Sequence, residues 1–146
     1  MQTTQAKPSL GGLIQSTNIP ETLVRAVVRQ MGGWESFKES APDICRGGID
    51  GGFHGFISYY ETTRFAKKNK EAIKQLAINQ AEEFGIGVVE MIKGFGCFRN
   101  DSPSDAEIID GLAGHAHNLE VRVLNALAWY AGEEVSRAYC DMTGEV

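Results

Sequence analysis

The stretch NLEVRVLNALAWYAGEEVSRAYCDM, residues 118–142, decides the fold of this 146-residue chain. At about 100° of rotation per residue, one broad face of a helix over 117–142 collects seven apolar side chains, namely Val123, Leu124, Leu127, Tyr130, Ala131, Val135 and Ala138. This pattern predicts a long helix laid against a core. Trp129 and Tyr139 fall off the face, so we expect them to serve self-association, most simply as a homodimer.

Glu134 interrupts the apolar face, because the same rotation places it within about 20° of Leu127. An unpaired buried carboxylate costs several kcal/mol or takes up a proton, so Glu134 needs a partner. We favour a structural ion pair, or a carboxylate at the rim of the core, over a functional carboxylate. If the pair is buried, Glu134→Ala should cost about 3 kcal/mol of stability.

A second long amphipathic pattern runs through TTRFAKKNKEAIKQLAINQAEEF, residues 62–84, and stops before Gly85. Shorter helices are predicted from Pro20 to Met31, from Trp34 to Ile44 with a break or kink at Pro42, over 88–95 and from Pro103 to Leu112. The patterns together predict an all-α fold, a single compact domain of six or seven helices built around the two long ones. The helix over 117–142 should pack against the helix over 62–84, since no other pattern has a face of matching length.

The ends of the chain differ from this helical centre. Residues 1–17 are polar and contain glycine without any period, which favours a flexible N-terminal arm. We place the helical domain at 18–142 and a short C-terminal tail at 143–146.

Composition limits the protein class. A hydrophobic content of 42% over this length fits one domain with a real core, so neither a metal nor a disulfide is needed to stabilise it. Cys45, Cys97 and Cys140 are odd in number, widely spaced and outside any CxxC pattern, which favours reduced thiols and a cytoplasmic location. No signal peptide or membrane span is recognisable, so we expect no membrane association.

Charge is unevenly distributed along the chain. The net charge is −5, and residues 100–146 carry nine acidic and two basic side chains while residues 1–99 carry ten acidic and twelve basic ones. A nucleic-acid mimic would be more acidic, and a non-specific nucleic-acid binder more basic. A basic stripe, Arg64, Lys67, Lys70 and Lys74, lines one flank of the helix over 62–84. It is either a solvated face or a surface that binds an acidic partner or a phosphate backbone.

No catalytic signature is recognisable. The Gly-rich aromatic segment 47–60 lacks GK[ST] and GxGxxG, so a phosphate-binding loop is disfavoured there. His115 and His117 could share a metal only in an extended loop with a third ligand such as His54, and no nucleophile is placed beside them by any motif. We therefore predict no enzyme activity, no catalytic residues, no metal and no cofactor. The alternative to this prediction is a small enzyme that uses Glu134, or Asp50 with His54.

Three stretches carry a resemblance to a known group of proteins. They are VRQMGGWESFKESAPDI at 28–44, GGFHGFISYYETTRFAKKNKEAI at 51–73 and LNALAWYAGEEVSRAY at 124–139. The chain resembles, over about residues 20–140, a family of small proteins of unknown function that tailed bacteriophages encode. The resemblance assigns no catalytic residue, and it implies a protein of the host cytoplasm.

The function that this resemblance implies is counter-defence. Small phage proteins outside the virion often bind a bacterial protein stoichiometrically, as inhibitors of CRISPR or restriction systems do. We therefore expect an inhibitor of a host defence complex that acts by protein–protein binding. The second alternative is a nucleic-acid-associated regulator that uses the basic stripe.

Overall fold

The computed structural model describes residues 9–46, 57–93, 103–114 and 117–144. The described residues form eight helices, six of which have seven residues or more, and the predicted all-α single domain is confirmed. The helices are α1 (Leu10–Gln15), α2 (Glu21–Gln30), α3 (Trp34–Arg46), α5 (Tyr59–Lys68), α6 (Lys70–Phe84), α7 (Val88–Lys93), α8 (Asp105–Ala113) and α9 (His117–Thr143). None of them is long and apolar enough to cross a membrane.

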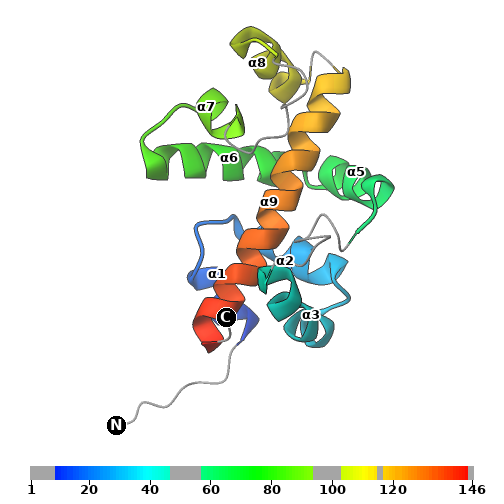
Figure 1. Cartoon of the computed structure of the whole chain (residues 1–146), viewed down its shortest axis with the longest axis vertical. Coiled ribbons are helices and arrows are strands. Elements are labelled where there is room, and N and C mark those ends of the chain that lie inside the picture. The colour runs from blue at the N-terminus through cyan, green and yellow to red at the C-terminus, as the bar shows by residue number, and fades with distance from the viewer. Residues whose placement is uncertain (1–8, 47–56, 94–102, 115–116, 145–146) are drawn as a thin grey trace.

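Helix α9 is the axis of the molecule. Figure 1 shows its 27 residues running through the length of the fold, with other helices on several sides. It contacts α1, α2, α3, α5, α6 and α8, so the predicted packing of the last helix against 62–84 is present. Val123, Leu127, Ala131 and Val135 are fully buried, which places the predicted apolar face in the core. Because helices surround α9, it buries more than this one face.

The predicted single helix over 62–84 is wrong, because the chain forms two helices with a break at Asn69. The backbone of Asn69 leaves the helical region, at φ −114° and ψ 26°. Its side-chain Nδ2 donates to the carbonyl oxygen of Phe65 at 2.9 Å, as does its backbone N–H at 3.0 Å. The side chain thus shares an acceptor with the backbone at the end of α5, a local contact that short polar side chains often make at helix ends. The first of the two helices also begins earlier than predicted, at Tyr59, after a capping box between Ser58 and Glu61.

The predicted flexible arm at 1–17 is wrong over residues 10–15, which form α1. Ser9 caps this helix by accepting a hydrogen bond from the N–H of Gly12 at 3.0 Å, and Leu13 is fully buried. Gly12 permits close packing on α9, since a Cβ there would lie 3.3 Å from Cε of Met142. A six-residue helix is too short to show a period, so it needs such tertiary contacts to form.

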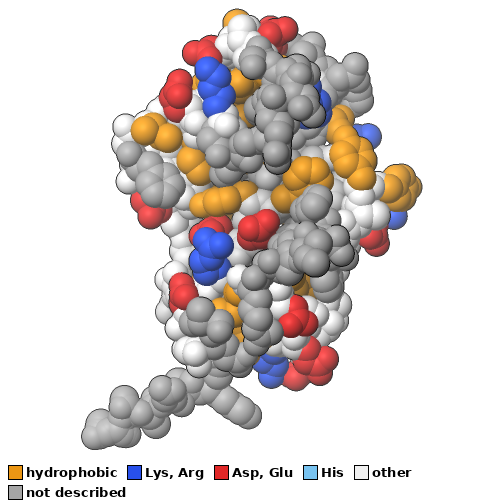
Figure 2. Space-filling view, viewed as in Figure 1, with side chains coloured by type: hydrophobic (Ala, Val, Ile, Leu, Met, Phe, Trp, Pro, Cys, Tyr) orange, Lys and Arg blue, Asp and Glu red, His pale blue; other side chains and the backbone are white. Residues whose placement is uncertain are grey.

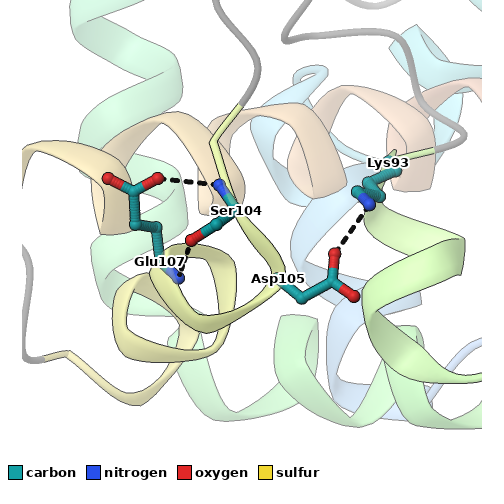
Figure 3. Close-up of polar contacts among 4 residues, drawn as sticks. All are labelled: Lys93, Ser104, Asp105 and Glu107. Carbon is teal, nitrogen blue, oxygen red and sulfur yellow. Dashed lines mark hydrogen bonds and ion pairs between the residues drawn. The ribbon is translucent and has the colours of Figure 1, made fainter.

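Capping and one ion pair position α8 (Figure 3). Ser104 Oγ accepts from the N–H of Glu107 at 3.2 Å, and the carboxylate of Glu107 accepts from the N–H of Ser104 at 2.7 Å. Lys93 at the end of α7 lies 2.6 Å from Asp105, which joins the two helices. Gly111 lets α8 approach α9 closely, because a Cβ there would lie 3.0 Å from Leu119.

Candidate binding surface

Two adjoining hollows lie where α2 faces the break between α5 and α6. The first, of about 230 Å³, is lined by residues of α2 and α5, and the second, of about 390 Å³, by residues on both sides of the break. Lys68 and Asn69 line both hollows. We call the cations that line them the basic junction: Arg29, Arg64, Lys67, Lys68 and Lys70.

Packing of α5 explains why these cations are presented together. Phe65 and Ala66 are buried in the core, so the next residues around the helix, Arg64, Lys67 and Lys68, are left in solvent. Lys67 and Lys68 also lie in the last turn of α5, where positive charge stabilises the negative end of the helix dipole. Two of the five cations, Lys67 and Lys68, therefore also stabilise helix α5.

Most of the charge of the basic junction is uncompensated. Arg29, Arg64, Lys67 and Lys68 are exposed, and within the described parts of the chain none of them forms an ion pair. Lys70 differs, because its Nζ lies 3.1 Å from the carboxylate of Glu120, which is 9% exposed, and this pair fastens α6 to α9. Uncompensated cations on one surface attract an anionic ligand.

Few acidic side chains oppose this charge. Glu61 and Glu71 are the acids that line the two hollows. The carboxylate of Glu61 already accepts the N–H of Ser58 at 3.0 Å. The local excess of positive charge is therefore real, although the whole chain carries −5.

Exposed aromatic side chains border the basic junction at the start of α5. Tyr59 is 59% and Tyr60 69% exposed. The guanidinium of Arg64 lies 5.7 Å from the centre of the Tyr60 ring, within the range of a cation–π contact. Figure 2 shows apolar and basic side chains next to one another along the edge where α5 lies in Figure 1. Tyrosine and arginine are enriched among residues that dominate protein–protein binding energy.

The predicted basic stripe is only partly one surface. Arg64 and Lys67 belong to α5, whereas Lys70 and Lys74 belong to α6 beyond the break. Lys74 lines neither hollow. Arg29 and Lys68 were missed, and Lys68 could have been found from its position in the same run of cations. Arg29 gives no signal in the sequence, because only the folded chain brings α2 beside α5.

A third, acidic hollow of about 490 Å³ lies between α6, the C-terminal half of α9 and residues 16–19. Its charged side chains are Glu83, Glu134, Arg137 and Asp141. Asn18 donates to the carboxylate of Glu83 at 2.9 Å. Arg137 lies 2.9 Å from Glu134, whose side chain keeps 29% of its surface exposed. Glu134 therefore has an ionic partner at the edge of the core.

Burial and neighbouring charges change two pKa values in the acidic hollow. Partial burial raises the pKa of Glu134 above its ordinary value of 4.5, and Arg137 opposes this rise. Burial, with the charges of Glu134 and Glu83, raises the pKa of Tyr130 to about 12. Tyr130 thus stays protonated at neutral pH and donates to the side-chain oxygen of Gln80 at 3.2 Å.

Comparison with known proteins gives one match that covers most of the chain. The family described as Domain of unknown function (DUF7222) matches residues 18–145. The chain belongs to the DUF7222 family. Neither a curated protein nor a solved structure matches it significantly. The family match spans the whole basic junction and all of the acidic hollow except Ser16 and Thr17, and the family description assigns no activity to either.

Glu134→Gln and Glu134→Ala are expected to change stability at pH 7 by less than about 1 kcal/mol, because the Glu134–Arg137 pair is partly exposed. Burial raises the pKa of Glu134 in the folded protein above its ordinary value of 4.5. The protonated carboxyl group therefore stabilises the fold fully below pH 4.5, and this stabilisation is lost as pH rises through the folded-state pKa. The stability of wild type relative to Glu134→Gln should therefore increase as pH falls from 7 towards 4.5. Urea unfolding at both pH values measures this difference. A loss near 3 kcal/mol at pH 7 would instead indicate a buried pair.

The prediction that Tyr139 serves self-association is wrong, because this side chain is 6% exposed within one chain. Its ring packs edge to face against Trp34 at 5.8 Å and Phe37 at 5.4 Å between ring centres. Helix α3 thus covers the side of α9 that helical periodicity had placed outside the apolar face. Trp129 is half-buried and donates to Thr62 Oγ1 at 3.0 Å. Self-association stays a prediction that needs a surface other than Tyr139.

Several sequence-based candidates lie outside the described residues. They are Asp50, His54, Cys97 and His115, together with residues 47–56 of the Gly-rich aromatic segment and the side chain of His117. Among the residues that the structure does describe, no group of three His, Cys, Asp or Glu side chains is arranged to hold a metal ion.

Proposed function

We propose that the protein acts by stoichiometric binding, and that the basic junction with Tyr59 and Tyr60 docks on an acidic surface of a partner protein. The observation that carries the proposal is a group of four exposed cations around two adjoining hollows, and none of the four forms an ion pair with a residue that the structure describes. Release of their mutual repulsion favours a complex with an acidic partner. The stacked pair of Arg64 and Tyr60 adds contact area of the kind that anchors protein interfaces.

A protein partner is favoured over nucleic acid by the charge of the rest of the chain. A chain with net charge −5 and pI about 5.2 on balance repels an extended phosphate backbone, which would reach beyond the basic junction. A compact acidic patch on a protein can match a surface of this limited size. A nucleic-acid-associated regulator remains the second proposal, because Arg64 and Tyr60 could also stack on bases.

We further propose that the partner is a bacterial defence complex, such as a CRISPR or restriction system, and that the chain is a phage-encoded inhibitor working in the host cytoplasm. Support comes from the resemblance of residues 28–44, 51–73 and 124–139 to small proteins of tailed bacteriophages. A blocking protein needs a docking surface rather than a catalytic centre, which fits the basic junction.

Expression of the chain should restore plating of a targeted phage on cells that carry the relevant CRISPR or restriction system. Tagged protein should retain the same defence complex from lysate after nuclease treatment, because the contact is with protein. Arg64→Glu with Lys68→Glu should abolish both effects. Arg25→Glu with Lys38→Glu is the control, since it changes net charge equally at cations that line neither hollow and whose ion pairs lie within single helices. Retention that nuclease abolishes would favour the nucleic-acid proposal.

A small enzyme is the third proposal, and the acidic hollow is the observation that favours it. Glu134, with its raised pKa, and the protonated Tyr130 lie in one hollow, and raised carboxyl pKa values occur among general acids and bases. An enzyme would lose activity in Glu134→Gln while folding normally. The ion pair with Arg137 gives Glu134 a structural role as well, which is why we rank binding first.

A further inference from the structure

Two cysteines distant in sequence meet at the packed interface between α3 and α9. Cys45 lies in the last turn of α3 and Cys140 near the end of α9, 95 positions later, and their sulfurs are 2.6 Å apart. Both thiols are free. A disulfide needs a sulfur–sulfur bond of about 2.05 Å, so only a small approach would be required.

The surroundings hold this pair in place. Ala41 and Ile44 of α3 are buried beside it in sequence, and Tyr139 of α9 packs against Phe37 of α3. The two helices are therefore fixed relative to each other by core packing, so the thiols meet without any loop movement. Such preorganisation raises the effective concentration of one thiol at the other and favours an intramolecular bond.

We propose that Cys45 and Cys140 form a reversible dithiol–disulfide site that reacts with small-molecule disulfides and, when oxidised, locks α3 to α9. This inference is independent of the basic junction. Sequence analysis predicted reduced thiols, and the proposal adds that two of them are placed to be oxidised together.

Exposure sets the order of the reaction. Cys45 is partly exposed whereas Cys140 is 2% exposed, so an oxidant reaches Cys45 first. The Cys45 thiolate attacks one sulfur of oxidised glutathione, which forms a mixed disulfide and releases one glutathione thiolate. Cys140, deprotonated in turn, attacks Sγ of Cys45 and releases the second glutathione. Two protein thiols are oxidised, one glutathione disulfide is reduced to two thiols, and the two protons pass to the released thiolates.

Burial also sets the speed of the reaction. Burial, with the hydrogen bond to Cys140 and the charge of Asp141, raises the pKa of Cys45 to about 12, and Arg137 opposes the rise. Little thiolate is present at neutral pH, so oxidation should be slow unless the solution is alkaline. Because the thiols react slowly, the oxidation state of the Cys45–Cys140 pair should persist once it has changed.

The test uses the full chain, reduced and then incubated with oxidised glutathione at pH 8.5. After denaturation in acid, N-ethylmaleimide should label neither Cys45 nor Cys140 in the oxidised protein and both of them in the reduced protein. In Cys97→Ser, which removes the third cysteine, the oxidised protein should take up no label. Peptide mapping should then find Cys45 joined to Cys140. Persistent labelling of both cysteines, or glutathione on each of them, would overturn the proposal.

Two single variants test the order of attack. Cys140→Ser should stop at a mixed disulfide of Cys45 with one glutathione, while Cys45→Ser should leave Cys140 unmodified in the folded protein. Equal modification of Cys140 in Cys45→Ser would overturn the proposed order. Wild-type protein tests the lock without any variant, because closing a loop of this length should raise Tm by about 10 °C on oxidation. A bond that left Tm unchanged would overturn the lock.

Discussion

Phe37→Ala is expected to lower the free energy of unfolding by about 4 kcal/mol, and Tm by about 15 °C. Phe37 is fully buried, and its ring lies 5.6 Å from Trp34 and 5.4 Å from Tyr139 between centres. Truncation removes the transfer free energy of the ring, opens a cavity between α3 and α9 and ends two aromatic contacts. Urea unfolding followed by circular dichroism measures the loss.

Two controls separate packing from a general effect of substitution. Phe37→Leu keeps an apolar side chain in the site and should cost about 1.5 kcal/mol. Tyr60→Ala removes an aromatic ring that is 69% exposed, so stability should change by less than about 0.5 kcal/mol. If Phe37→Ala unfolded at the same urea concentration as Tyr60→Ala, the aromatic cluster of Trp34, Phe37 and Tyr139 would have no part in stability.

The long helix α9 was predictable because its apolar residues recur at helical spacing over many turns. Helix ends marked by glycine were also predictable, since Gly85 and Gly114 end α6 and α8 at positive φ, of 72° and 89°. Periodicity reports which residues of one helix share a face. It does not report how many other helices cover that helix, which is why Tyr139 was assigned to the surface and is buried by α3.

The break at Asn69 was missed because the apolar pattern continues through it. Phe65 and Ala66 before the break and Ile73 after it are all buried, as they would be in one helix. At the break the Asn69 side chain donates one hydrogen bond to the carbonyl oxygen of Phe65, and periodicity cannot register such a contact. The break matters for function, since both hollows of the basic junction are lined by Asn69.

Contacts between distant segments account for the rest of what the sequence did not reveal. Arg29 joins Arg64 and Lys68 only because α2 lies beside α5, and Cys45 meets Cys140 across 95 positions. Neither approach leaves a local pattern in the chain. The cations of residues 64–70 were visible as a run, but their pairing state was not. Lys70 proved to be neutralised by Glu120, which lies 50 positions away.

Reversal of two cations at the basic junction should have the largest effect on binding. Arg64→Glu with Lys68→Glu is expected to weaken binding of poly-L-glutamate, a probe for an acidic protein surface, by about 100-fold at low salt. Both side chains are exposed, line the same hollow and form no ion pair among the described residues, so stability should change little. Fluorescence anisotropy at increasing salt concentration measures the affinity.

The salt dependence identifies the cause of this loss. Wild-type affinity should fall as salt rises, because salt screens exposed charges over about 10 Å at 0.1 M, and the double variant should show a flatter dependence. Arg25→Glu with Lys38→Glu gives the same net charge at cations paired with Glu21 and Glu35 within single helices, and it should bind almost as well as wild type. Single-stranded DNA of similar length serves as the competing probe. Equal weakening by both double variants would assign the effect to net charge, and the basic junction would then be only a solvated surface. Tighter binding of the DNA than of poly-L-glutamate would favour the nucleic-acid proposal.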